Sequence, residues 1–231
     1  MKVHWLQHVP FEGLGFIETW LSSIGADLSV TRFWAEQTLP PPRDIDMLFV
    51  MGGPMGVGDE LKYPWLSQEK RFIEAVIGQG AVIVGICLGA QLVAEVLGAA
   101  VRKNEFKEIG WFSIERCLSG DSRLHRLLPP AMMALHWHHD CFGIPVGSLH
   151  LLRSEGCAAQ GFLLDDRILG LQCHLEPTRQ GVLDLLANCR ADMTPGPWVQ
   201  SEEEIIAKAV YAEQAHKVLA GLLDYLRPSS S

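Results

Sequence analysis

A cysteine at a sharp strand-to-helix joint constrains this chain more than any other sequence feature. Residues 81–91 read AVIVGICLGAQ: an apolar, β-branched run that meets a glycine, Cys87 and a second glycine. Within residues 92–97 the apolar side chains then recur at the spacing of one buried helix face. The pattern predicts a buried strand, a very tight turn and a helix, with Cys87 at the apex of the turn.

Gly85 and Gly89 stand two residues before and two residues after Cys87. The chain folds back on itself there, so a side chain at either position would clash. An apex residue is usually strained, which aims its side chain outward, and a helix N-terminus favours a thiolate. The alternative is a plain core role for Cys87, because free cysteines are commonly buried. The two flanking glycines favour a nucleophilic role for Cys87 over a core role.

The first hundred residues alternate between predicted strands and helices. The expected strands are 2–9, 27–33, 47–51 and the run before Cys87, and the expected helices are 16–23, 67–79 and the one after Cys87. This alternation predicts an α/β fold in three layers, with a mostly parallel central sheet and helices on both faces. Ligands of such sheets bind beyond the carboxyl ends of the strands, where the loops 10–15 and 52–58 join the Cys87 turn.

The second half of the chain is different in character. Short strand-like runs are expected at 111–116, 132–137, 149–153, 159–163 and 168–174, which predicts a small antiparallel sheet. Asp165 and Asp166 suit a hairpin turn. A helix is expected after Pro177, and a capping box opens a long amphipathic helix at 201–226. We expect one domain over residues 1–231, with 201–226 as a C-terminal helical extension that packs on the core and 229–231 as a frayed end.

Charge and cysteine content exclude several classes of protein. The formal net charge is −8, from 19 Lys and Arg against 27 Asp and Glu, with no basic run, which argues against nucleic-acid binding. The N-terminus lacks the apolar core of a signal peptide, and no apolar run reaches the roughly 20 residues that span a bilayer. Six scattered cysteines without CxxC pairs predict free thiols in a reducing cytoplasm.

A thiol nucleophile needs a base and a group that orients the base. Residues 172–177, QCHLEP, end a predicted strand, and residues two apart on a strand point to the same side. Glu176 can therefore hold one imidazole nitrogen of His174 while the other faces the sulfur. The alternative is a surface histidine beside a solvated glutamate.

An oxyanion hole is expected from two backbone N–H groups. The residue after the elbow, Leu88, supplies one. Gly53, in the 51–54 segment MGGP, is the expected second donor, because glycines let the backbone approach a substrate closely. A simple tight turn is the alternative for this segment.

Taken together, these motifs closely resemble those of class I glutamine amidotransferases, and the nearest match is a stand-alone branch akin to the glutaminase domain of GMP synthase. The resemblance covers roughly residues 3–190. Supporting segments are LQHVPFEG at 6–13, YPWL at 63–66, EIGW at 108–111 and HWHHD at 136–140. It implies a flavodoxin-like fold and attack by Cys87 on the side-chain amide of glutamine. A γ-glutamyl thioester and ammonia would follow, with His174 protonating the ammonia and then activating water.

The resemblance also implies a substrate pocket formed by Gly52, Gln91, His138 and Asp140, with no cofactor. Two positions depart from the family pattern. Leu175 replaces the usual proline between His174 and Glu176, and His139 replaces the usual glycine of the His-Gly-Asp segment, which narrows the pocket.

His136 and His138 share a strand face and could be metal ligands. Without a third ligand at suitable spacing, we expect a pocket wall and no metal.

Three functions are compatible with these residues. The first is a glutaminase that supplies ammonia to a separate synthetase, since the sequence carries no ATP-binding motif. The second is a free-standing γ-glutamyl peptide or metabolite hydrolase with the same triad. The third is a non-enzymatic regulatory protein that keeps the fold. A protease or chaperone of the wider cysteine-elbow superfold lacks the His-x-Glu segment.

Overall fold

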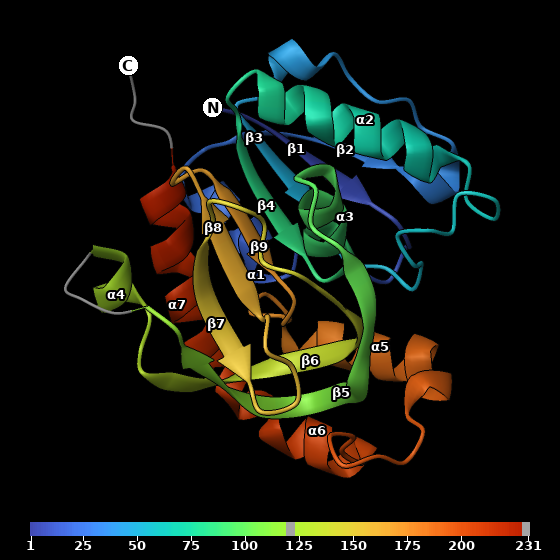
Figure 1. The fold of residues 1–231 in the computed structure, drawn as a ribbon, viewed down its shortest axis with the longest axis vertical. Helices are drawn as coiled ribbons and strands as arrows, with labels where there is room; N and C mark the ends of the chain where they lie inside the picture. The colour runs from blue at the N-terminus through green and yellow to red at the C-terminus, as the bar shows by residue number, and fades with distance from the viewer. Residues whose placement is uncertain (119–122, 228–231) are drawn as a thin grey trace.

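The computed structural model describes residues 1–118 and 123–227; the predicted frayed end at 229–231 lies outside them. Figure 1 shows a single large sheet with helices on both sides. The strands are β1 (Lys2–Gln7), β2 (Asp27–Arg32), β3 (Met47–Val50), β4 (Val82–Ile86), β5 (Val101–Arg116), β6 (Ala131–Phe142), β7 (Leu149–Ser154), β8 (Gly161–Leu164) and β9 (Ile168–Leu171). The helices are α1 (Phe16–Ser23), α2 (Trp65–Gly78), α3 (Leu88–Val96), α4 (Arg123–Leu127), α5 (Arg179–Cys189), α6 (Glu202–Lys208) and α7 (Ala212–Leu226).

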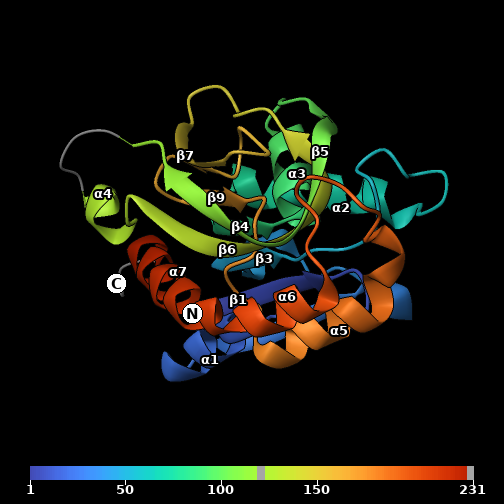
Figure 2. The same ribbon diagram turned by 90° about the horizontal axis from the view of Figure 1, so that it is seen from below.

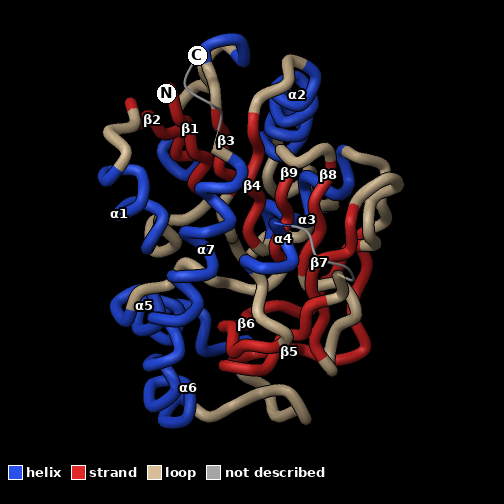
Figure 3. The backbone as a smooth tube through the Cα atoms, turned by 90° about the vertical axis from the view of Figure 1, so that its left-hand side faces the viewer, coloured by secondary structure: helices blue, strands red, loops and turns tan. Residues whose placement is uncertain are grey.

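The sheet has the strand order β2-β1-β3-β4-β9-β8-β7-β5-β6. Strands β2, β1, β3 and β4 are parallel, as predicted, and β9 is parallel to β4, although the run at 168–174 is expected in the antiparallel sheet. The antiparallel strands do not form a separate small sheet: β8 pairs with β9, so they continue the same nine-stranded sheet (Figure 3). The hairpin turn between β8 and β9 is also as predicted, with Asp165 and Asp166 at φ of 52° and 53°.

Each face of the parallel strands is covered by its own helices. Met47 and Phe49 of β3 pack in one apolar cluster with α1 and α7, and Leu48 and Val50 pack in another with α2 and α3. Figure 2 shows α1 and α7 together on one side of the sheet. Because β3 is buried on both faces, it is a continuous apolar run.

Several predicted elements have different bounds, and two differ most. Strand β5 begins at Val101 rather than at 111, because its polar first half pairs with β6 across a bulge between Lys103 and Glu108. The predicted helix 201–226 is two helices, α6 and α7, separated by a 3-10 turn at Ala209–Tyr211. Its predicted capping box is present, at Ser201 and Glu204.

The helix is broken because its two parts pack on different clusters. Ile205 of α6 is buried with residues of α5, whereas Leu219 of α7 is buried with residues of α1 and the sheet. The apolar face of the C-terminal segment therefore packs on the core, as predicted.

Gln200, just before α6, attaches the C-terminal segment to β5. Its side-chain Oε1 accepts a hydrogen bond from the Trp111 N–H at 2.9 Å, and its Nε2 donates to the Trp111 carbonyl at 2.7 Å. The side chain occupies the space beside Gly110, whose φ is 125° and where a Cβ would lie 2.7 Å from the Gln200 Cδ atom. The Gln200 side chain thus extends the sheet in place of a strand.

Over residues 1–118 and 123–227, none of the helices combines the length and apolar character that a membrane crossing requires.

Candidate active site

Cys87 sits at the tight turn between β4 and α3. Its φ is 52° and its ψ is −110°, a strained conformation for a non-glycine residue, and its N–H donates to the Leu171 carbonyl at 2.8 Å. A Cβ on Gly85 would lie 2.7 Å from the Gly89 backbone, and a Cβ on Gly89 would overlap the Val50 carbonyl oxygen. Only glycine at both positions permits this turn.

His174 and Glu176 lie just past β9 and face each other. The Nδ1 atom of His174 is 2.7 Å from Oε1 of Glu176, and both side chains are buried. Backbone hydrogen bonds to Leu135 of β6, at 2.8 and 3.2 Å, fix His174 in place. His174 and Cys87 line the same small cavity of about 50 Å³. The structure therefore brings together the three residues that the sequence predicts as a triad.

The surroundings of His174 favour its charged form. Burial acts to lower the pKa of His174, but the charge of Glu176 and hydrogen bonds to Cys87 and Glu176 outweigh burial and raise this pKa well above its ordinary value. A protonated imidazole beside a sulfur is the arrangement that stabilises a thiolate.

Glu176→Gln is expected to lower the pKa of His174 and to destabilise the fold most at low pH. The raised pKa contributes stability that is fully present below about pH 6.5, the ordinary histidine value, and is lost as the pH rises through the folded-state pKa. The difference in unfolding free energy between wild type and variant should therefore shrink as the pH rises. Urea unfolding over a pH series measures it, with the exposed Glu18→Gln as control. A difference that grows with pH would contradict this assignment.

The two predicted oxyanion donors border one pocket beside the sulfur. Gly53 follows β3, Leu88 begins α3, and both line a cavity of about 290 Å³ together with Cys87. We call this cavity the larger pocket, since it is the larger of the two that Cys87 lines. Space at Gly53 is tight, because a Cβ there would lie 3.2 Å from the Leu88 side chain and 2.9 Å from that of His8.

A buried histidine holds the peptide that carries the Gly53 N–H. Nδ1 of His8 is 3.0 Å from the Gly52 carbonyl oxygen, and Nε2 is 2.8 Å from a carboxylate oxygen of Glu69. Burial acts to lower the pKa of His8, but Glu69 raises it, so both ring nitrogens can donate. In a trans peptide the N–H points opposite to the carbonyl. The bond to His8 therefore directs the Gly53 N–H away from His8.

Three of the four predicted substrate-binding residues line the larger pocket. Gln91, His138 and Asp140 do so, and Nε2 of Gln91 donates to the Asp140 carbonyl at 3.3 Å. Gly52 instead lines a neighbouring cavity of about 160 Å³, with His174 and Glu176. His139, the departure from the family pattern, also lines the larger pocket.

The sequence did not identify several residues of the site. Lys103, Lys107 and Asp192 place charges of both signs around the larger pocket. Glu12 lies beside Gly52 and His174. Burial raises the pKa of its carboxyl group above the ordinary value, and the charges of His174 and His8 only partly offset this effect. The available signal for Glu12 was its place in the loop after the first strand, at the ligand-binding edge of the sheet.

Comparison with known proteins agrees with this architecture. Residues 16–189 match the family described as glutamine amidotransferase class-I. The chain is 34% identical over 200 residues to the glutamine amidotransferase-like protein YfeJ of Salmonella typhimurium, covering 84% of this chain and 83% of that protein. It is 31% identical over 136 residues to one subunit of the glutamine-hydrolysing GMP synthase of Sulfurisphaera tokodaii, covering 58% of this chain and 69% of that protein.

A solved structure extends the similarity to the whole fold. The crystal structure of a glutamine amidotransferase from Methylobacillus flagellatus superposes with a TM-score of 0.88 at 29% identity, covering 100% of this chain and 97% of that one. The chain therefore belongs to the class I glutamine amidotransferases.

Proposed function

We propose that this protein hydrolyses the side-chain amide of L-glutamine through a thioester on Cys87 and supplies the ammonia to a separate synthetase. The observation that carries the proposal is the shared cavity of Cys87 and His174, with His174 bonded to Glu176 at 2.7 Å. Cys87 is the nucleophile, His174 the acid and base, and Glu176 orients His174.

The first half of the reaction forms the thioester. The Cys87 thiolate attacks the amide carbon, and the carbonyl electron pair moves onto oxygen, where the N–H groups of Gly53 and Leu88 stabilise the negative charge. When the carbon–nitrogen bond breaks, the nitrogen takes the proton of His174 and leaves as ammonia. The acyl group stays on the sulfur as a γ-glutamyl thioester.

The second half returns the free enzyme. His174, now neutral, takes a proton from water as the oxygen attacks the thioester carbon. The carbon–sulfur bond breaks, glutamate is released, and Cys87 is again a thiolate beside a protonated His174.

Pocket size and charge support a single amino acid as the substrate. A volume of about 290 Å³ lies at the small end of ligand pockets, which span about 300–1,000 Å³. Lysines 103 and 107 can pair with an α-carboxylate, and Asp140 and Asp192 with an α-ammonium group. The Sulfurisphaera tokodaii relative is one subunit of its GMP synthase, and this supports a partner chain for the acceptor reaction.

A substrate panel tests the proposal. Purified protein is given glutamine or γ-glutamyl peptides, and glutamate and ammonia are both measured. We expect ammonia from glutamine in equal amount to glutamate. Peptide turnover with negligible glutamine turnover would replace the proposal with a γ-glutamyl hydrolase.

Covalent labelling distinguishes a site without a reactive nucleophile from a site that turns over substrate only with its partner enzyme. A diazoketone analogue of glutamine should modify the wild-type protein but not Cys87→Ser. The control is Cys117→Ser, at a half-buried cysteine, which should be modified like wild type. Mass spectrometry of the intact protein measures the added group. Absence of both labelling and turnover would favour a non-enzymatic protein.

A further inference from the structure

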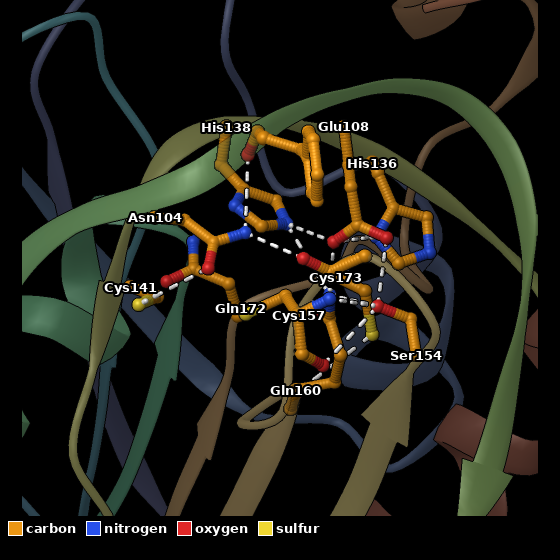
Figure 4. Close-up of polar contacts among 12 residues, drawn as sticks. Asn104, Glu108, His136, His138, Cys141, Ser154, Cys157, Gln160, Gln172 and Cys173 are labelled. Carbon is orange, nitrogen blue, oxygen red and sulfur yellow. Dashed lines mark hydrogen bonds and ion pairs between the residues drawn. The ribbon is translucent and has the colours of Figure 1, made fainter. Parts of the chain in front are cut away.

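Behind the wall of the larger pocket, β5 and β6 enclose a group of polar side chains (Figure 4). Glu108 lies opposite His138 in the strand register, and Gly110 lies opposite His136. Since residues two apart share a strand face, both histidines lie on the face of Glu108, and Gly110 adds no side chain between them. The three side chains are 0% or 1% exposed.

The carboxylate of Glu108 faces a nitrogen of each ring. Its Oε2 atom is 3.1 Å from Nε2 of His138 and 3.6 Å from Nδ1 of His136. Nδ1 of His138 is 3.2 Å from the Asp140 carbonyl oxygen, a partner that can only accept, so Nδ1 carries the proton. In the neutral ring, Nε2 is then an acceptor that lies 3.1 Å from a second acceptor, the Glu108 oxygen, and a cation between the two atoms would offset their repulsion.

His136 is a second, independent sign of a missing partner. The residue is fully buried, and within residues 1–118 and 123–227 neither Nδ1 nor Nε2 makes a hydrogen bond of normal geometry, although the ring lies close to the Phe112 backbone. Buried polar side chains are nearly always hydrogen-bonded, and an exception calls for a specific explanation such as an ion.

We propose that Glu108, His136 and His138 bind one divalent transition-metal ion of the zinc class. Metal–ligand bonds of about 2.0–2.1 Å in a tetrahedral arrangement separate neighbouring ligand atoms by about 3.3 Å. The two carboxylate–imidazole distances, 3.1 and 3.6 Å, fall on either side of this value, and ligand atoms of all three residues lie within 4.8 Å of one another. Two imidazoles and one carboxylate suit zinc better than calcium or magnesium, which prefer oxygen ligands.

Gln160 is placed to complete the coordination. Its Nε2 atom is 2.7 Å from the same Glu108 oxygen and 3.3 Å from Nε2 of His138, while its Oε1 atom has no hydrogen-bond partner in the part of the chain that the structure describes. Turning the amide by half a rotation would direct Oε1 toward the ion. Outside the first ring of ligands, Ser154 donates to Oε1 of Glu108 at 2.7 Å and the Asp140 carbonyl holds His138, which is the support that metal-binding side chains usually have.

This inference departs from the sequence-based expectation of no metal. The sequence shows no third ligand near His136 and His138. Glu108 can act as the third ligand only because the pairing of β5 with β6 places it beside them. Without metal, the Nε2 atom of Gln160 can donate to the Glu108 oxygen, but among the described residues His136 still has no hydrogen-bond partner of normal geometry.

Metal analysis of the intact protein tests the site. Protein freed of metal by a chelator is titrated with Zn²⁺ alone, and bound zinc is counted by mass spectrometry after gel filtration. We expect one zinc ion per chain, an increase in the thermal midpoint, and, with Co²⁺ instead, the strong visible absorption of a four-coordinate ion. Wild-type protein with no bound zinc and no change in midpoint would overturn the proposal without any variant.

Variants locate the ion. Glu108→Gln keeps the shape of the side chain and should weaken zinc affinity by at least about tenfold, as should His136→Asn, whereas Glu115→Gln, exposed on the same strand, should bind like wild type. Because Cys87 and His174 could also hold zinc, Cys87→Ser is titrated in parallel and should still bind one ion. Undiminished zinc binding by Glu108→Gln, or binding lost only in Cys87→Ser, would overturn the assignment.

Discussion

Cys87→Ser is expected to lower kcat for glutamine hydrolysis by a factor on the order of 10⁴ or more, which is the scale for loss of a nucleophile. The hydroxyl of serine is far less ionised than a thiol beside a charged imidazole, so attack on the amide would be slow. The other cysteine of the small cavity is a poor replacement. Cys189 lines the small cavity beside Cys87, but burial raises its pKa to about 12, so it stays a thiol.

Ammonia release, measured with an enzyme-coupled assay, checks this result. Cys117→Ser, at a cysteine remote from these cavities, serves as the control and should keep wild-type turnover. Matching thermal midpoints for the two variants would show that the fold is kept. Glutamine hydrolysis by Cys87→Ser at the wild-type rate would rule out the thioester mechanism.

Gly89→Ala is expected to have the largest effect on stability, a loss of about 3 kcal/mol or more in unfolding free energy, if the variant folds at all. The added methyl group would overlap the Val50 carbonyl oxygen of β3, and backbone cannot move aside as a flexible side chain can. Displacing β3 from α3 would also displace Gly53 and Leu88 relative to each other.

A matched control separates this clash from the general effect of a methyl group on a helix. Gly78 ends α2, and nothing lies within 4 Å of a Cβ added there. Gly78→Ala should be neutral or stabilising by up to about 1 kcal/mol, since alanine favours helix more than glycine does. Urea unfolding of both variants gives the comparison, and equal stabilities would contradict the close approach of α3 to β3.

The sequence alone predicts those parts of the site whose residues are close together in the chain. Gly85, Cys87 and Gly89 define one turn, and His174 and Glu176 are two residues apart on one extended segment. Their relation follows from the periodicity of strands and helices alone. The meeting of Cys87 and His174 is predicted from the needs of a triad alone, because the strand before His174 is expected in the antiparallel sheet, whereas β9 pairs in parallel with β4.

Elsewhere the relevant contacts join distant segments. Glu69 supports His8 across 61 residues, and Glu108 reaches His138 through strand pairing in a segment whose polar residues, such as Lys103 and Lys107, conceal its strand character. Neither contact leaves a local pattern. The joint between α6 and α7 is similar, since its residues are ordinary helix formers and only the different clusters beneath Ile205 and Leu219 separate the two helices.

The hydrogen bonds between Gln200 and Trp111 determine at which stage of synthesis the pocket can be completed. A ribosome makes the chain from its N-terminus, so β1 to β4 and the Cys87 turn emerge long before residue 200. Ile109, which lines the larger pocket, exchanges backbone hydrogen bonds with Trp198 and Gln200. While residues 198–200 are still inside the ribosomal exit tunnel, Cys87 would lie beside a pocket whose wall is incomplete. The wall of the pocket around Cys87 is therefore complete only after residues 198–200 have left the tunnel.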